Sequence, residues 1–154
     1  MTEPHILAYI AGFFDGEGCV MIGVSHHTGT KNPQASLSVE VMQTDIRPID
    51  LLYKEFPSDR SRKPRKHSMH WKYKRVYAWG LCGERAYLFC KYILPFSIVK
   101  REQLELAIKF YELPWRNPRA RRGGKWSHRT QEQVAIDIDF ARQMKEAKHN
   151  AISH

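Results

Sequence analysis

Two carboxylates separated by glycines lie near the start of the chain and have the spacing of groups that could bind a metal ion. Asp15 and Glu17 alternate with Gly16 and Gly18 directly after an apolar segment. If that segment is a helix, the partial negative charge of its C-terminus is unfavourable beside two carboxylates, and a cation would relieve the repulsion. The stretch therefore predicts a cation site at a helix end. The simpler alternative is a glycine cap followed by two solvated carboxylates.

The element that must position these acids has apolar residues at helical spacing. They are Ile6, Leu7, Ile10, Phe13 and Phe14. Because proline is tolerated in a first helical turn, Thr2-Glu3-Pro4 predicts the helix start, and the helix is expected to run to about Asp15. A second stripe of small residues, Ala8, Gly12 and Gly16, would let another backbone approach closely. Glycine inside a helix costs roughly 1 kcal/mol relative to alanine, so a packing role is expected for Gly12.

The run from Ile10 to Gly18 resembles the signature of the LAGLIDADG homing endonucleases position by position, with Glu17 where aspartate is more common. The resemblance extends from residue 5 to about residue 112, and the signature occurs once. It implies an α+β fold of the order αββαββα, with a four-stranded antiparallel DNA-binding sheet, here followed by extra C-terminal helices. Residues 1–113 would form the endonuclease core, and residues 114–154 a basic arm and a C-terminal helix packed on the same domain.

The resemblance also implies the catalytic residues. Glu17 and the backbone carbonyl of Gly16 would hold a divalent metal, while Gln43 at a strand end would position water and Lys100 would stabilise charge at the phosphate. Oxygen ligands suit Mg²⁺, for which Mn²⁺ would substitute, and a bound metal lowers the pKa of water and neutralises charge on a phosphate. The chain is therefore expected to be a site-specific, metal-dependent DNA endonuclease.

One signature supplies one metal-binding acid, whereas cutting both strands of DNA needs two active sites. A homodimer through the first helix is therefore expected on a near-palindromic duplex of roughly two helical turns. The predicted interface residues are Ala8, Ala11, Gly12, Asp15 and Gly16. Asp15 is interpreted as a structural group at the helix end. Two copies of Glu17 would meet near the centre of the minor groove.

Two segments that alternate between apolar and polar residues follow the first helix and predict antiparallel strands. Their apolar faces hold Val20, Ile22 and Val24 in the first, and Leu37, Val39 and Val41 in the second, which runs from Gln34 to Gln43. Further strands are expected at residues 59–65 and 74–82, with Tyr77, Trp79 and Leu81 inward. The polar faces are candidates for DNA contact, although a solvated antiparallel face would look the same.

The chain is basic, with a formal net charge of +9, and its charge is concentrated in two segments. Residues 57–75 hold eight Arg or Lys against one acid, and residues 116–129 hold six with no acid. This pattern favours a polyanionic partner, and the second segment is either a phosphate-binding arm or a solubilising linker. Arg60 and Arg62, two residues apart on the expected third strand, are predicted to read guanine, whereas Lys63, Lys66 and Arg75 are predicted to contact phosphates. The predicted DNA contacts are Ser25, His27, Gln34, Ser36, Ser38, Glu40, Arg60, Arg62, Lys63, Lys66 and Arg75.

Four further helices are expected from periodicity and capping residues. The first of these starts at Thr44 or Asp45 and is stopped by Pro57. Two more cover residues 84–94 and 100–113, and the last follows a capping-box pattern at Thr130 and Gln133. The predicted buried stripes are Leu104, Ala107, Ile108 and Tyr111 in the helix at 100–113, and Val134, Ile138, Ala141 and Met144 in the last helix.

Other classes of function are weighed against this interpretation. Three cysteines without a Cys-x-x-Cys pair, no membrane span and no signal peptide favour an intracellular protein, in an organelle that encodes it or in a bacterial or phage-infected cytoplasm. The histidine pairs at 26–27 and 67/70 are a weaker signal for a transition-metal site. A non-catalytic binder of the same fold, an intron-RNA maturase or a DNA-binding regulator, is the main alternative. A basic scaffold with an accidental motif is the third.

Overall fold

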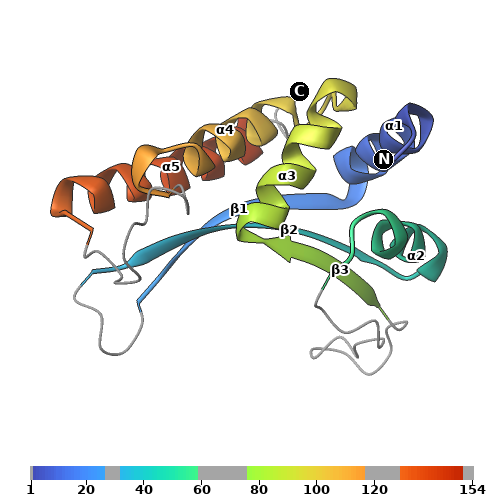
Figure 1. Ribbon diagram of the computed structural model, residues 1–154, viewed down its shortest axis with the longest axis horizontal. Helices are drawn as coiled ribbons and strands as arrows, with labels where there is room; N and C mark the ends of the chain where they lie inside the picture. Colours follow the sequence, from blue (N-terminus) through green and yellow to red (C-terminus); the bar gives the residue numbers. More distant parts are fainter. Residues whose placement is uncertain (1, 27–31, 59–75, 117–128, 151–154) are drawn as a thin grey trace.

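The computed structural model describes residues 2–26, 32–58, 76–116 and 129–150. Figure 1 shows a sheet whose helices gather mainly on one face. Along the chain the elements are α1 (Pro4–Glu17), β1 (Gly18–Ser25), β2 (Gln34–Gln43), α2 (Ile46–Glu55), β3 (Tyr77–Cys82), α3 (Gly83–Ile93), η1 (Leu94–Phe96), α4 (Arg101–Tyr111), η2 (Pro114–Arg116) and α5 (Gln131–Asn150). The predicted α+β class is confirmed. The strand expected at 59–65 lies outside the described residues. Among the described helices, none is long and apolar enough to cross a membrane.

The described sheet has three strands, and β2 pairs antiparallel with β1 on one side and β3 on the other. The register places Val20 opposite Val39, and Val41 opposite Trp79. These four side chains are fully buried under the helices. The apolar faces predicted from alternation are therefore confirmed. Two predicted residues differ: Val24 is 39% exposed near the end of β1, and Tyr77 at the start of β3 is only partly buried.

Aromatic packing fixes the end of α1 against the sheet. The ring centroid of Phe89 lies 5.1 Å from that of Phe14 and 4.9 Å from that of Trp79. A Cβ atom built on Gly18 would lie 2.3 Å from the Phe14 ring, so only glycine lets a strand begin this close to the helix. α1 runs through Glu17, two residues beyond its predicted end, and passes directly into β1.

The buried stripe of α4 differs in part from the predicted one. Leu104 and Ala107 are fully buried as predicted, but Ile108 and Tyr111 are only partly buried. Phe110 is fully buried instead, with its ring centroid 5.7 Å from that of Phe140 on α5. A helix covered on two sides buries a wider face than one apolar stripe, and α5 covers the side that holds Phe110.

Two helix starts predicted from capping residues are confirmed. Asp45 caps α2, where its carboxylate accepts a hydrogen bond of 2.9 Å from the backbone N–H of Arg47. At the start of α5 the Thr130 N–H donates to Gln133 Oε1 at 3.1 Å, and the Gln133 N–H donates to Thr130 Oγ1 at 3.2 Å. Each cap satisfies backbone groups that a helix end leaves without partners.

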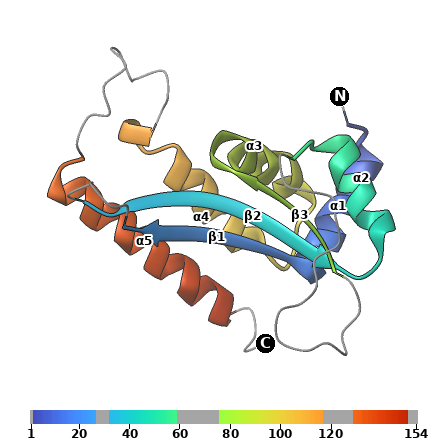
Figure 2. The same ribbon diagram turned by 90° about the horizontal axis from the view of Figure 1, so that it is seen from below.

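α5 runs beside β1 along the edge of the sheet, as Figure 2 shows, and carries a buried charge that periodicity did not predict. Asp137 is 2% exposed, whereas Ile138, predicted in the buried stripe, is 47% exposed. Arg116 donates to Asp137 from Nε at 3.1 Å and pairs with it through Nη2 at 2.7 Å, and Arg129 pairs with it as well. The buried face shifts toward Asp137 because these arginines compensate the burial of its charge.

Candidate active site

Glu17 is the last residue of α1, and its side chain is exposed. Within the described residues its carboxylate makes no hydrogen bond and no ion pair. The negative charge therefore lies at the C-terminal end of a helix without a directly paired cation among the described residues, which is electrostatically unfavourable. This arrangement leaves the carboxylate available to a cation.

Asp15, two residues earlier, is held by its own chain. Its carboxylate accepts hydrogen bonds from the Ser97 hydroxyl and from the backbone N–H groups of residues 98–100, the latter at 2.7, 3.0 and 3.1 Å. Burial raises the pKa of Asp15, but the hydrogen bonds from Ser97 and from the three N–H groups outweigh it and hold the pKa below its usual value. Asp15 thus ties the end of α1 to the turn before α4.

That turn positions Lys100. Its ammonium group is half-buried and donates a hydrogen bond to the backbone carbonyl of Asp15. Burial lowers the pKa of Lys100, while the negative charges of Asp15 and Glu17 act in the opposite direction. The fold therefore brings Lys100 and Glu17, two of the residues predicted from sequence, into one site.

Gln43 is the last residue of β2 and lies at the same end of the sheet. β1 begins at Gly18 opposite Val41, so Gln43 is two residues beyond this pair. Its Oε1 accepts hydrogen bonds from the Thr44 N–H at 2.7 Å and the Thr44 hydroxyl at 3.2 Å. Its amide nitrogen makes no hydrogen bond among the described residues. An amide with a free donor can orient a water molecule or a phosphate oxygen.

The end of α1 fits a magnesium ion that is bound together with its substrate. The described part of the chain contains no group of three or more His, Cys, Asp or Glu that could hold a metal by itself. Mg²⁺ needs only one or two carboxylates when waters and phosphate oxygens complete its shell. Glu17 offers a carboxylate, and Gly16 lies in the last helical turn, where carbonyl groups lack helical partners. These donors fit such a shared site.

Solved structures share this architecture, although neither a family model nor a curated protein sequence matches the chain. The chain is similar to the archaeal intron-encoded homing endonuclease I-Vdi141I complexed with DNA, with a TM-score of 0.68 and 12% identity over 95% of this chain and 86% of that one. It is similar to the homing endonuclease I-TnaI, with a TM-score of 0.58 and 18% identity over 94% and 97%. The LAGLIDADG meganuclease I-AabMI bound to uncleaved DNA gives a TM-score of 0.58 and 21% identity over 93% and 46%.

The chain has the LAGLIDADG homing endonuclease fold. The resemblance of the motif at residues 10–18 is thereby confirmed at the level of the fold. In that fold the motif helix is α1, and Glu17 stands at its end. At identities of 12%, 18% and 21%, the likeness lies in the arrangement of helices and strands.

The LAGLIDADG fold of this chain leaves one face of β1 and β2 without a covering helix in its described part (Figure 1). Side chains on this open face alternate with the buried ones, and the register pairs Ser25 with Gln34 and Met21 with Ser38. Ser25 and Ser36 are exposed, and Gln34, Ser38 and Glu40 are partly buried. Contact of these residues with DNA stays a prediction. The other predicted contacts lie outside the described residues: His27, Arg60, Arg62, Lys63, Lys66 and Arg75.

The small residues of α1 lie on its outer side. Ala8, Gly12 and Gly16 are exposed, and a Cβ atom built on either glycine would meet nothing within 4 Å. Packing among the described residues therefore does not require these glycines. Ala11, which sequence analysis placed on the same surface, is instead fully buried, because it lies on the stripe of α1 that also carries Phe14. The other predicted interface residues stay predictions.

Lys148, in the last turn of α5, lies at this site although no sequence pattern indicated it. Its Nζ donates a hydrogen bond to Cys19 Sγ at 3.2 Å, and Cys19 follows Glu17 by two residues. The positive charge of Lys148 also lowers the pKa of Lys100. Periodicity assigns an apolar stripe to this helix, and nothing in the local sequence links its last turn to the first helix.

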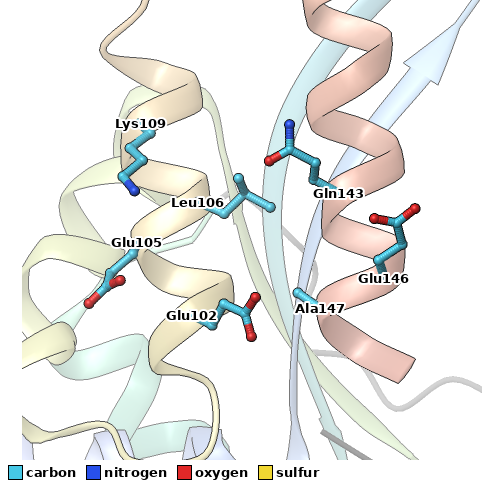
Figure 3. Close-up of a pocket in the computed structure, with 7 residues that line it drawn as sticks. All are labelled: Glu102, Glu105, Leu106, Lys109, Gln143, Glu146 and Ala147. Atoms are coloured by element: carbon cyan, nitrogen blue, oxygen red, sulfur yellow. The ribbon is translucent and has the colours of Figure 1, made fainter. Parts of the chain in front are cut away.

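A pocket between α4 and α5 has an acidic lining and none of the predicted site residues. Its volume is about 270 Å³. It is lined by Glu102, Glu105, Leu106, Lys109, Gln143, Glu146 and Ala147 (Figure 3). Figure 3 shows Glu102 and Leu106 directed from α4 toward α5. Its glutamates would repel phosphate, so this pocket is not suited to nucleic acid.

Proposed function

We propose that this protein is a metal-dependent endonuclease that cuts both strands of DNA at a long, near-palindromic site as a homodimer. The observation that carries the proposal is the exposed Glu17 carboxylate, which has no partner among the described residues and lies beside Lys100 at the end of α1. I-Vdi141I is a homing endonuclease complexed with DNA and I-AabMI is a meganuclease bound to uncleaved DNA, and this chain shares their fold.

Hydrolysis of a phosphodiester is slow because its negative charge repels a hydroxide nucleophile. A bound divalent metal lowers the pKa of water and neutralises charge on the phosphate. Glu17 and the Gly16 carbonyl would hold Mg²⁺, or Mn²⁺ in its place. Lys100 would set a positive charge beside the phosphate, and the free amide donor of Gln43 would orient the attacking water.

The homodimer follows from one Glu17 in each chain and two strands to be cut. This chain matches 97% of I-TnaI but 46% of I-AabMI, so it corresponds to about half of the longer protein. The exposed stripe of Ala8, Gly12 and Gly16 would pack on the same stripe of a second copy, as in an isologous two-fold interface. Two copies of Glu17 would then come together at the dimer axis.

Duplex DNA would lie on the open face of each protomer, with one half-site in contact with each sheet. The basic residues of 59–75 would supply phosphate contacts and guanine contacts there. The main alternative is a nucleic-acid binder of the same fold that does not cut, such as an intron-RNA maturase or a DNA-binding regulator. Catalysis is favoured because a carboxylate at this exposed helix end contributes nothing to binding a polyanion.

A cleavage assay with matched variants tests the proposal. Duplexes are first selected for binding from a pool with about 21 randomised base pairs, which is two helical turns. The wild-type protein should cut both strands of these duplexes with Mg²⁺ and not with EDTA. Glu17→Gln should bind the same duplexes but cut about 1,000-fold more slowly. Glu132→Gln removes the same charge from an exposed position on α5 and should cut like the wild type.

Each outcome of that assay is decisive. Tight binding without cleavage by the wild-type protein would replace the endonuclease with the non-catalytic binder. If Glu17→Gln cut as fast as the wild type, Glu17 would not be a ligand of the metal. Equal losses in Glu17→Gln and Glu132→Gln would mean that overall charge, rather than the end of α1, determines the rate.

A further inference from the structure

Lys148 reaches the open face of the sheet from a helix that packs on the other side. α5 runs beside β1 at the sheet edge (Figure 2), and Lys148 lies in its last turn. The ammonium group contacts Cys19 Sγ at 3.2 Å. Cys19 alternates along β1 with Val20, which is fully buried, so the thiol belongs to the opposite, open face. The lysine thus ends near Glu17 on the side proposed to hold DNA.

The charge of Lys148 is not compensated by a carboxylate. In the described part of the chain it forms no ion pair, and its hydrogen-bond partner is a thiol, which is a weak acceptor. Arg142 on the same helix is different, because it pairs with Asp139 and with Glu146. Lys148 instead lies close enough to Lys100 for the two positive charges to interact unfavourably. An anion bound between two neighbouring ammonium groups would relieve their repulsion.

We propose that Lys148 contacts a DNA phosphate at the reaction centre, where it acts with Lys100 on the strand being cut. This assignment rests on the proposed function and adds a residue to it. It also gives α5 a role in the site: the helix carries a cation to the end of α1 from a distant part of the sequence. In a homodimer, two copies of Lys148 would each contact one phosphate.

The salt dependence of DNA binding tests this contact without requiring cleavage. Each phosphate contact contributes about 0.9 to the slope of log K against log salt concentration. Lys148→Met should therefore lower the slope by about 1.8 for a dimer on a selected duplex, measured in EDTA, while Lys148→Arg should keep it. Lys145→Met removes the same charge from an exposed position on the same helix and should leave the slope unchanged. With Mg²⁺, Lys148→Met should also cut about 100-fold more slowly.

A packing role for Lys148 predicts other results. If Lys148→Met has the slope of Lys145→Met, or if Lys148→Arg loses as much slope as Lys148→Met, the phosphate contact is wrong. Thermal unfolding checks that the variants are folded, and Lys148→Gln supplies a second neutral variant if methionine lowers the melting temperature. Wild-type protein that binds but does not cut would overturn the proposed function alone, because the slope still decides on Lys148. Wild-type protein that binds no duplex DNA would overturn both the proposed function and the phosphate contact of Lys148.

Discussion

Asp137 on α5 and Glu17 at the end of α1 are both carboxylates, but their surroundings are opposite. Asp137, in the first half of the helix, is 2% exposed and is paired with Arg116 and Arg129. Near the last turn of the same helix, Glu17 is exposed, and among the described residues neither it nor Lys148 forms an ion pair. One cluster of charges is closed within the protein, and the other is left open.

The difference separates charges that hold the fold from charges that await a ligand. In the closed cluster Arg116 also donates to the Ala35 carbonyl at 3.1 Å and lies over the Phe110 ring at 3.6 Å, so α5, β2 and α4 meet around one ion pair. The open cluster has no ion pair among the described residues, and its one contact between elements is the weak hydrogen bond from Lys148 to the Cys19 thiol. Charges without partners lower stability, and they are expected where binding of a ligand restores the balance.

Breaking the closed cluster should give the largest loss of stability. Asp137→Asn leaves the buried charge of Arg116 without its carboxylate, and removing one partner of a buried pair costs about 3–5 kcal/mol. The free energy of unfolding in urea measures this loss. Asp139→Asn, two residues along, removes a carboxylate whose pair with Arg142 is at the surface and should have a much smaller effect. Similar losses in the two variants would contradict the distinction between closed and open charge.

The sequence predicted those elements whose burial follows a single period. Residues Gln34–Gln43 form a strand with the predicted bounds, because one face is covered and alternation records it. Periodicity wrongly predicted Ile138 to be buried and did not predict the burial of Phe110. Phe110 is buried because α4 and α5 pack against each other, and Asp137 is buried in place of Ile138 because Arg116 pairs with its charge. Such helix–helix contacts have no local sequence signature.

The candidate site was predictable only as far as the motif extends. Glu17, Gln43 and Lys100 were assigned by resemblance, and the structure brings Lys100 to Glu17. The hydrogen bonds from residues 97–100 to Asp15 and the approach of Lys148 to Cys19 depend on tertiary packing between segments far apart in the chain. A single sequence holds no record of them.

Gly18 at the start of β1 and Gly12 in α1 show the same contrast between packed and open surroundings, and alanine at the two positions should change stability with opposite signs. Gly18→Ala would drive a Cβ atom into the packed Phe14 ring and should lower stability by about 1–3 kcal/mol. Gly12→Ala enters open space and should stabilise the isolated protomer by about 1 kcal/mol. If α1 is the dimer interface, the same substitution should weaken self-association about 10-fold in analytical ultracentrifugation. If Gly12→Ala left self-association unchanged, α1 would not be the dimer interface.

Asp15 and Glu17 differ in the same way, although both lie in one helical turn. The pH dependence of stability should show this difference, and we expect it to be the smallest of the predicted effects. The pKa of Asp15 is lowered in the folded protein, so its contribution to stability is present above about pH 4 and is lost as pH falls through the folded pKa. Asp15→Asn should therefore be less stable than the wild type by about 1 kcal/mol near pH 7, after allowance for solvent screening, and the gap should close below pH 4.

Glu17→Gln supplies the matched measurement, because the carboxylate of Glu17 has no partner among the described residues and lies unfavourably at a helix C-terminus. Its free energy of unfolding near pH 7 should equal or slightly exceed that of the wild type. Asp15→Asn should also release the turn at residues 97–100, so Lys100 would lose its fixed position and cleavage would slow without loss of DNA binding. If Glu17→Gln were the less stable of the two variants, Glu17 would be a structural carboxylate, and the open site at the end of α1 would not exist.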